Sequence, residues 1–137
     1  MRLITTEAQR HRDEEEGKDP RTSPIIGAAE IHRHLGPGLL ESAYEECLCH
    51  ELHLRGLDFK RQVALPLLYK GLRLDCGYKL DRIVQDEIIL ESKAVEKLLP
   101  IHEAQLLTYL RLTSKRVGLL INFNVPLLTQ DIIRRVL

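Results

Sequence analysis

The spacing of apolar residues changes along the chain, and each spacing predicts a different kind of element. From residue 23 to residue 55, apolar side chains recur every three or four residues, as on the buried face of a helix. Ser23-Pro24 is a typical helix start, Gly36-Pro37-Gly38 interrupts the pattern, and Gly56 ends it. We therefore predict a short helix from residue 23 and a second helix over about residues 39–55.

Strand patterns follow the helices. Residues 59–69 and 72–84 alternate between apolar and polar side chains, which predicts two antiparallel strands joined by a Lys-Gly turn. Residues 87–94 hold an almost continuous apolar run, as expected for a strand covered on both faces. A helical pattern over residues 101–113 leads to a second apolar strand over residues 117–123.

The order of these elements predicts the fold class. Strand 87–94, helix 101–113 and strand 117–123 have the order of a crossover between parallel strands, whereas the two strands before them are antiparallel. The final segment, residues 129–137, is compatible with a strand or a short helix. We predict an α/β fold with a mixed central sheet flanked by helices.

The first residues differ in composition from the rest. The segment HRDEEEGKDP is charged and nearly free of apolar side chains, so it cannot bury enough surface to offset the entropy of ordering. We predict a charged, flexible N-terminal arm over residues 1–22 and a single domain over residues 23–137. A chain of 137 residues that is 44% hydrophobic is large enough to bury one core.

Charge and cysteine content narrow the function classes. Twenty basic and twenty acidic residues give zero net charge, which argues against a general polyanion-binding protein but leaves room for a local basic patch. The three cysteines show no metal-finger spacing and fit a reducing compartment. We see no signal peptide, and no apolar run approaches the roughly 20 residues of a membrane span. These features predict a cytoplasmic protein with no membrane association.

Charged residues gather at the end of the apolar strand 87–94. Glu91 and Lys93 are two residues apart, so they share one face of a strand, and Ser92 points the other way. With Asp81, Glu91 supplies two carboxylates that could bind Mg²⁺, and the Lys93 ammonium could orient or deprotonate an attacking water or stabilise a pentavalent phosphate. The alternative is a set of strand-end charges exposed to solvent.

The two carboxylates can converge in only one strand register. If Asp81 lies opposite Glu91 on antiparallel strands, residue 84 pairs with residue 88, and Gln85-Asp86-Glu87 forms the loop. A slip of one residue would place the two acids on opposite faces of the sheet. We therefore predict the first register.

Glu41 is a third acidic candidate. On a helical wheel it lies between the directions of Leu48 and Leu52, inside the apolar arc. A carboxylate there is costly unless it is paired or bound to a cation, so it predicts either a metal ligand or a buried salt bridge. We expect Glu41, Asp81 and Glu91 to approach one point near Lys93, and we expect at least one of their pKa values to rise.

The later helix carries three polar candidates on one face. His102, Gln105 and Tyr109 are spaced by three and then four residues, and the helix begins soon after Lys93. Gln105 could orient a metal-bound water or contact phosphate, and Tyr109 could contact phosphate or a base. His102 could contact substrate or only cap the helix. The alternative is a polar edge on a core helix.

Several short strings match a known family in order and spacing. Gly38-Leu39-Leu40-Glu41-Ser42-Ala43-Tyr44 has the pattern GxxExxY. The other matching pieces are Gln62, Asp81, Glu91-Ser92-Lys93-Ala94-Val95, His102-Glu103-Ala104-Gln105, Tyr109-Leu110 and Gly118-Leu119-Leu120-Ile121-Asn122-Phe123. From about Ile25 to the C-terminus, the chain resembles the GxxExxY protein family, which is similar to the PD-(D/E)XK nuclease superfamily. Leu80 replaces the proline of that name, a frequent loss in the superfamily.

The resemblance implies a restriction-endonuclease-like core with Asp81, Glu91 and Lys93 at its metal and catalytic positions. Gln105 and Tyr109 are similar to a helix motif beside the active site of RecB-type nucleases. These likenesses and the residues themselves predict a Mg²⁺- or Mn²⁺-dependent nuclease acting on DNA or RNA, with DNA favoured. Asp81 and Glu91 would bind the metal, and Glu41 would assist directly or through water.

Two alternatives stay open. The first is a catalytically inactive module of the same fold that binds nucleic acid or a protein partner, which zero net charge and small size favour slightly. The second is a scaffold whose charged cluster is a structural ion-pair network. A homodimer or a partner protein is compatible with either reading.

Overall fold

The computed structural model describes residues 20–75, 77–128 and 131–137, and most of the predicted arm lies outside this range. Within these residues, three helices come first, then four strands, then a strand–helix–strand unit and a last strand. The elements are α2 (Ser23–Ala28), α3 (Ile31–Leu35), α4 (Glu41–Leu54), β1 (Phe59–Ala64), β2 (Leu67–Tyr69), β3 (Leu72–Leu74), β4 (Lys79–Val84), β5 (Ile88–Lys93), α5 (Pro100–Thr113), β6 (Val117–Asn122) and β7 (Ile132–Val136). The predicted α/β class is confirmed.

A mixed sheet of five strands forms the centre of the fold, in the order β1-β4-β5-β6-β7. Strands β5 and β6 are parallel, and α5 connects them, as the sequence pattern predicted. The other neighbouring pairs are antiparallel. The last segment, for which the sequence allowed a strand or a helix, is the edge strand β7.

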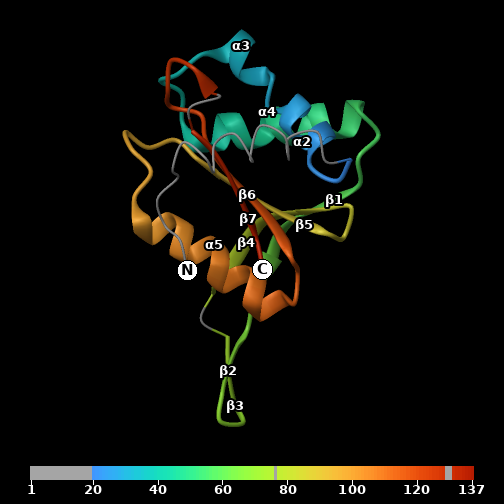
Figure 1. Cartoon of the computed structure of the whole chain (residues 1–137), viewed down its shortest axis with the longest axis vertical. Coiled ribbons are helices and arrows are strands. Elements are labelled where there is room, and N and C mark those ends of the chain that lie inside the picture. Colours follow the sequence, from blue (N-terminus) through green and yellow to red (C-terminus); the bar gives the residue numbers. More distant parts are fainter. Residues whose placement is uncertain (1–19, 76, 129–130) are drawn as a thin grey trace.

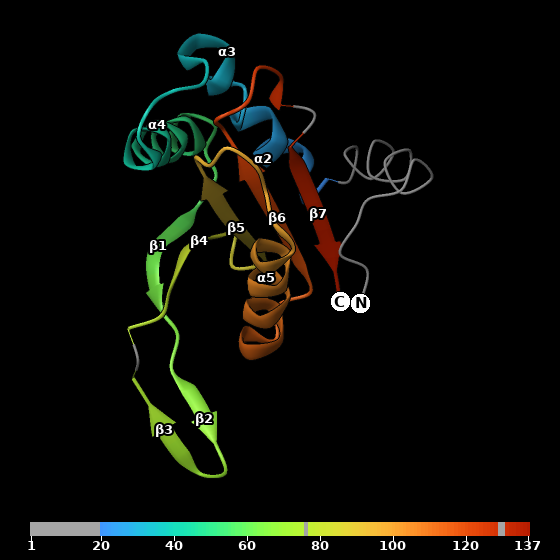
Figure 2. The ribbon, with the colours of Figure 1, turned by 90° about the vertical axis from the view of Figure 1, so that its left-hand side faces the viewer.

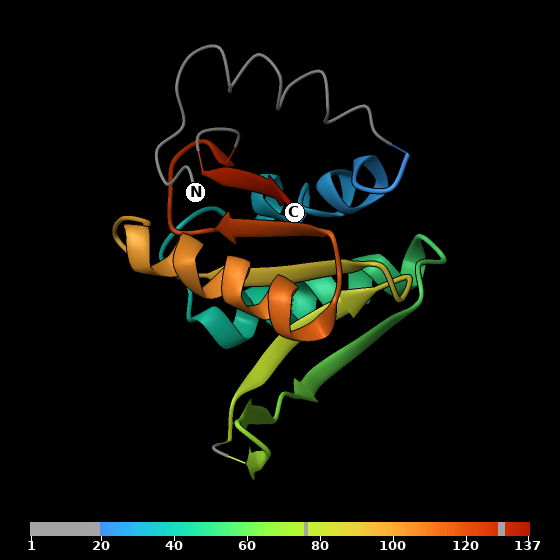
Figure 3. The ribbon, with the colours of Figure 1, turned by 60° about the horizontal axis from the view of Figure 1, so that its bottom comes forward.

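Helices cover both faces of the sheet (Figures 1 and 3). Helices α2, α3 and α4 pack on one face, where Ile25, Leu48 and Phe123 belong to one buried cluster. Helix α5 packs on the other face, where Leu106, Leu110 and Leu120 belong to a second cluster. Because side chains alternate between the faces of a strand, β5 contributes Ile88 and Leu90 to the first cluster and Ile89 to the second.

Two predicted elements are divided in the structure. The first helix ends at Ala28, where the Glu30 N–H bonds to the Gly27 carbonyl in a tighter turn, and glycine weakens a helix through its backbone freedom. The long hairpin is divided at Pro66, which has no N–H to donate to a ladder. Its outer part, β2 and β3, therefore forms a separate two-stranded sheet that projects from the body (Figure 2).

No helix within the described residues has the length and hydropathy needed to cross a membrane.

Replacing Gly118 by alanine is expected to lower the free energy of unfolding by about 1–3 kcal/mol. A Cβ at this position of β6 would lie 2.7 Å from Cδ1 of the buried Leu106 on α5, so the helix or the side chain must shift. Denaturant unfolding measures the loss, and adding Leu106→Val to Gly118→Ala should recover part of it. If Gly118→Ala lowered the free energy of unfolding equally with Leu106 and with Val at position 106, the predicted contact would be contradicted.

Candidate active site

The register of β4 and β5 is the predicted one. Val84 pairs with Ile88 and Arg82 with Leu90, so residues 85–87 form the loop and the next step places Asp81 opposite Glu91. Gln85 and Asp86 have positive φ angles, 53° and 54°, as tight hairpin turns require. The pairing that would have separated the two acids is excluded.

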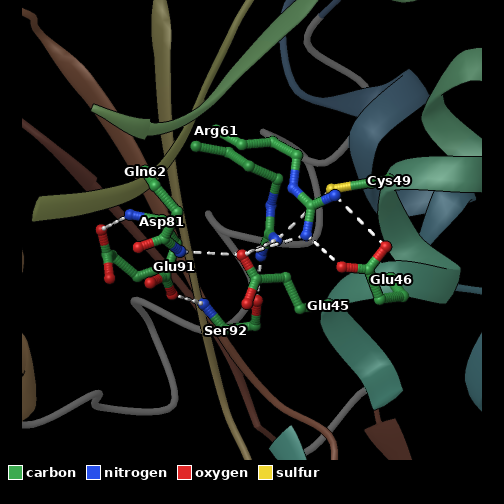
Figure 4. Close-up of polar contacts among 9 residues, drawn as sticks. Glu45, Glu46, Cys49, Arg61, Gln62, Asp81, Glu91 and Ser92 are labelled. Carbon is green, nitrogen blue, oxygen red and sulfur yellow. Dashed lines mark hydrogen bonds and ion pairs between the residues drawn. The ribbon is translucent and has the colours of Figure 1, made fainter. Parts of the chain in front are cut away.

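The Asp81 and Glu91 carboxylates each accept a hydrogen bond from the backbone of the other strand (Figure 4). The Asp81 N–H donates to Glu91 Oε1 over 3.0 Å, and the Ser92 N–H donates to Asp81 Oδ2 over 3.0 Å. Each carboxylate therefore bonds to the backbone of the opposite strand at the point where the regular ladder ends. This arrangement places both acid groups together at the carboxyl end of β5.

Glu91 is buried, with only 5% of its surface exposed. Burial raises the pKa of its carboxyl group from 4.5 to about 8, and the neighbouring Asp81 charge contributes in the same direction. Lys93 acts in the opposite direction on the same pKa, but its effect is smaller. At neutral pH the metal-free Glu91 carboxyl is therefore mostly protonated, and a bound cation would favour its ionised form. The prediction that a carboxylate pKa rises here is confirmed.

Lys93 is the last residue of β5 and shares a face with Glu91. The structure holds the chain in place just beyond it. In the parallel register Lys93 lies beside Asn122, and the Asn122 side chain bonds to both the N–H and the carbonyl of Val95 over 3.1 and 2.9 Å. These bonds tie the segment after Lys93 to the end of β6.

Glu41 does not occupy the position predicted for it. It is exposed, and the buried residues of α4 are Tyr44, Leu48, Cys49 and Leu52. The helical wheel predicted a buried Glu41, but Glu41 is the first residue of α4, and no preceding helical turn covers its side chain. Partial burial still raises its pKa, with the Lys93 charge opposing and the Asp81 charge adding to this rise. Glu41 therefore lies at the rim of the acidic pair.

The described residues contain no group of three or more His, Cys, Asp or Glu side chains arranged to hold a metal ion. The predicted convergence of three carboxylates is therefore wrong, and the structure brings together two, Asp81 and Glu91.

The candidates on α5 differ in their distance from the acids. Burial raises the Tyr109 pKa, and the charges of Glu91 and Asp81 raise it further. Tyr109 is therefore the α5 candidate that lies near the acids. His102 Nδ1 accepts a hydrogen bond from the Leu99 N–H over 2.9 Å, so its ring caps the helix, as the sequence allowed. Burial and the Lys93 charge lower the His102 pKa. Gln105 is exposed, and its role stays a prediction.

Sequence reasoning missed a polar network on the opposite face of the sheet (Figure 4). Arg82 is fully buried, donates to the Ser92 hydroxyl and lies 3.7 Å from Glu45 Oε1. Gln62 lies beside Asp81 with a positive φ of 49° and donates to the same Glu45 oxygen over 2.9 Å. The alternation of side chains along β4 could have indicated this network. Because successive residues of a strand point to opposite faces, Arg82 must face away from the acids if Asp81 faces toward them.

The GxxExxY segment has a clear structural role. The Tyr44 hydroxyl donates to the Gly36 carbonyl over 2.6 Å and accepts from the Leu39 N–H over 3.1 Å, and its ring stacks on Phe123. The Gly38 N–H bonds to Asn124 Oδ1 over 3.0 Å. These contacts fix the loop that leads into α4 and so determine where Glu41 lies.

Tyr44→Phe is expected to lower the free energy of unfolding by about 1–2 kcal/mol, because a partly buried carbonyl and a backbone N–H lose their partner. Tyr69→Phe, at an exposed position of β2, is the matched control and should change stability by less than about 0.5 kcal/mol. Chemical denaturation checks both, and equal effects would show that the Tyr44 hydroxyl is not needed.

A divalent metal ion fits this site by its donor chemistry. Asp81 and Glu91 offer oxygen atoms, which hard cations prefer. Burial and the Asp81 charge raise the Glu91 pKa, and a cation bound between the two carboxylates would oppose both effects. Mg²⁺ commonly binds through one or two carboxylates and keeps several waters, so a third protein ligand is not required.

Comparison with known proteins agrees with the fold. Residues 20–136 match the PD-(D/E)XK nuclease superfamily. This match covers most of the chain, and the protein therefore belongs to that superfamily. Its five-stranded sheet with flanking helices is consistent with a restriction-endonuclease-like fold. No curated protein and no solved structure shows significant similarity to the chain.

Proposed function

We propose that this protein is a Mg²⁺- or Mn²⁺-dependent nuclease of the GxxExxY type that hydrolyses phosphodiester bonds in nucleic acid, with DNA favoured over RNA. Nucleases of this superfamily generally depend on divalent metals. The main support is the Asp81–Glu91 pair, which lies at the end of β5 with Lys93 on the same face. A cytoplasmic location is part of the proposal.

Each site residue has an assigned role. Asp81 and Glu91 would hold the cation through their carboxylate oxygens, and Glu41 at the rim would assist through a water molecule. The bound cation would polarise the phosphate and favour ionisation of its water. Lys93 Nζ donates hydrogen bonds that position the attacking water or a non-bridging phosphate oxygen. Tyr109 and His102 contact the substrate beside the acids, and Gln105 positions the water or contacts phosphate.

The reaction is the hydrolysis of a phosphodiester. The oxygen of the attacking water forms a new bond to phosphorus and gives up one proton to solvent. One phosphorus–oxygen ester bond breaks, and the leaving oxygen takes up a proton from solvent. The hydrogen bonds between Asn122 and Val95 hold the backbone just beyond Lys93, so the lysine side chain starts from a fixed position on the same strand as Glu91.

A cleavage assay tests this proposal. The purified protein is incubated with single-stranded and duplex DNA and RNA in Mg²⁺, Mn²⁺, Ca²⁺ or EDTA. Product is expected with Mg²⁺ or Mn²⁺ and not with EDTA. Calcium should bind but support little turnover, because its looser coordination holds the reacting groups less firmly. Calorimetric binding of Mn²⁺ with every substrate left intact would instead favour the non-cleaving binding module.

A further inference from the structure

The hairpin formed by β2 and β3 has a composition unlike the rest of the surface. It projects from the ends of β1 and β4, away from the helices (Figure 2). Tyr69 and Tyr78 are 62% and 48% exposed, so two of the four tyrosines in the chain lie on this projection or at its base. A two-stranded hairpin gains little stability from its own contacts, and its exposed apolar side chains are accessible to a partner.

One face of the hairpin is apolar. Leu67 pairs with Leu74 and Tyr69 pairs with Leu72, and residues two apart on a strand share a face, so all four side chains lie together. This face offers aromatic and aliphatic contact but, apart from the Tyr69 hydroxyl, no polar side chain that could read the edges of paired bases. It suits the exposed faces of unpaired bases, which stack on tyrosine.

The charge of the hairpin favours an anionic partner. Residues 67–79 carry the cations Lys70, Arg73 and Lys79 and a single acid, Asp75, in a chain whose net charge is zero. Asp75 lies 3.7 Å from Arg73 Nε in an exposed ion pair, which leaves an excess of positive charge on the hairpin. The Lys70 ammonium lies 5.4 Å from the centre of the Tyr69 ring, so a cation and an aromatic face stand side by side near the turn. This combination is typical of surfaces that follow a single-stranded phosphate backbone.

The hairpin leads directly to the acidic pair. Tyr78 precedes Asp81 by three residues, a distance of about 10 Å along a strand. The Tyr78 carbonyl accepts a hydrogen bond from the Leu65 N–H over 2.9 Å, which fixes its backbone at the base of the projection. Tyr78 also lies within electrostatic reach of Tyr109, beside Glu91 and Asp81. The exposed Tyr69 and Tyr78 therefore lie on the hairpin side of the acids, and the half-buried Tyr109 lies beside them.

We propose that the β2–β3 hairpin binds an unpaired stretch of nucleic acid, with bases stacked on Tyr69 and Tyr78 and phosphates held by Lys70, Arg73 and Lys79, and delivers it to the Asp81–Glu91 pair. This inference rests on the proposed nuclease function, and it assigns single-stranded nucleic acid, or an unpaired segment within a duplex, as the substrate.

Fluorescence anisotropy with a labelled single-stranded DNA oligonucleotide tests the proposal. Every measurement uses the full chain with the additional substitution Lys93→Ala, in buffer that contains Ca²⁺, so that the oligonucleotide is not cleaved. Tyr69→Ala/Tyr78→Ala should raise the dissociation constant about tenfold or more. Lys70→Ala/Arg73→Ala should weaken binding and lower the salt slope by about 1–2. The charge-matched control Arg33→Ala/Arg111→Ala, at exposed sites on α3 and α5, should leave the dissociation constant unchanged.

Several results would overturn the proposal. These are no binding of the probe, equal affinity for a fully paired duplex, no effect of either hairpin variant, or a dimer in sedimentation that Tyr69→Ala/Leu72→Ala dissociates. The experiments distinguish failure of the proposed nuclease function from failure of the proposed hairpin role. Hairpin-dependent binding without cleavage by the unmutated chain would refute the nuclease and keep the hairpin role. Cleavage that is unaffected by the hairpin variants would refute the hairpin role alone.

Discussion

Lys93→Ala is expected to reduce phosphodiester cleavage by at least about 10³-fold, with the fold intact, because a fixed charge at the reacting phosphate commonly contributes this much. Lys93 is only half-buried, so its removal leaves no large cavity. Asp81→Asn should have a similar effect on activity, since it removes one negative charge from the pair that would hold the metal. Initial rates at saturating Mg²⁺ or Mn²⁺, together with circular dichroism of each variant, provide the measurement.

Lys60→Ala is the matched control for this prediction. Lys60 is an exposed lysine of β1 that pairs with Ile83 of β4. It therefore lies closer to the β4–β5 loop, residues 85–87, than to Asp81 and Glu91. Its replacement should change the rate by no more than about twofold, as for an ordinary surface substitution. If Lys93→Ala retained the activity of the Lys60 control, Lys93 would have no part in the chemistry.

Glu91→Gln is expected to stabilise the metal-free protein on the order of 3 kcal/mol at pH 7. The Glu91 pKa is about 8 in the folded chain, compared with 4.5 for an ordinary glutamate, so the folded state binds more protons between these pH values. Stability of the unmodified protein therefore falls as the pH rises from about 4.5 to about 8. Glutamine carries no charge, so the variant lacks this loss and can still accept the Asp81 N–H.

The advantage of the variant should be absent near pH 4, should grow through neutral pH and should level off above pH 8, the region of the Glu91 pKa. Thermal or denaturant unfolding in EDTA across this range measures it. Glu96→Gln, at an exposed position five residues further along, is the control and should show no such growth. A variant less stable than the unmodified chain at pH 8 would show that Glu91 is not under electrostatic strain.

Metal binding should reverse the order of stability. Mn²⁺ stabilises whichever folded state it binds, so the unmodified protein should gain stability with added Mn²⁺. Glu91→Gln should gain much less, because it has lost a charged ligand. Metal-dependent stabilisation that is equal in both proteins would place the ion away from Glu91.

Local sequence determined much of the sheet and the position of the acids. Alternation over residues 72–84, the apolar run over residues 87–94 and three turn residues between them leave one register that buries both apolar sets. That register alone places Asp81 opposite Glu91, and the period of two then orients Lys93. These features follow from neighbours along the chain, so the sequence by itself was sufficient for them.

Contacts between distant segments decided the rest. Glu41 is exposed because α4 begins at that residue, where the Tyr44 hydroxyl holds the preceding loop, and a helical wheel contains no such information. Gln62 reaches Glu45 only because its backbone adopts a positive φ beside Asp81, and Tyr78 stands near Tyr109 only because α5 crosses that end of the sheet. Periodicity describes a side chain relative to its own element, whereas its final environment depends on which other elements pack against it.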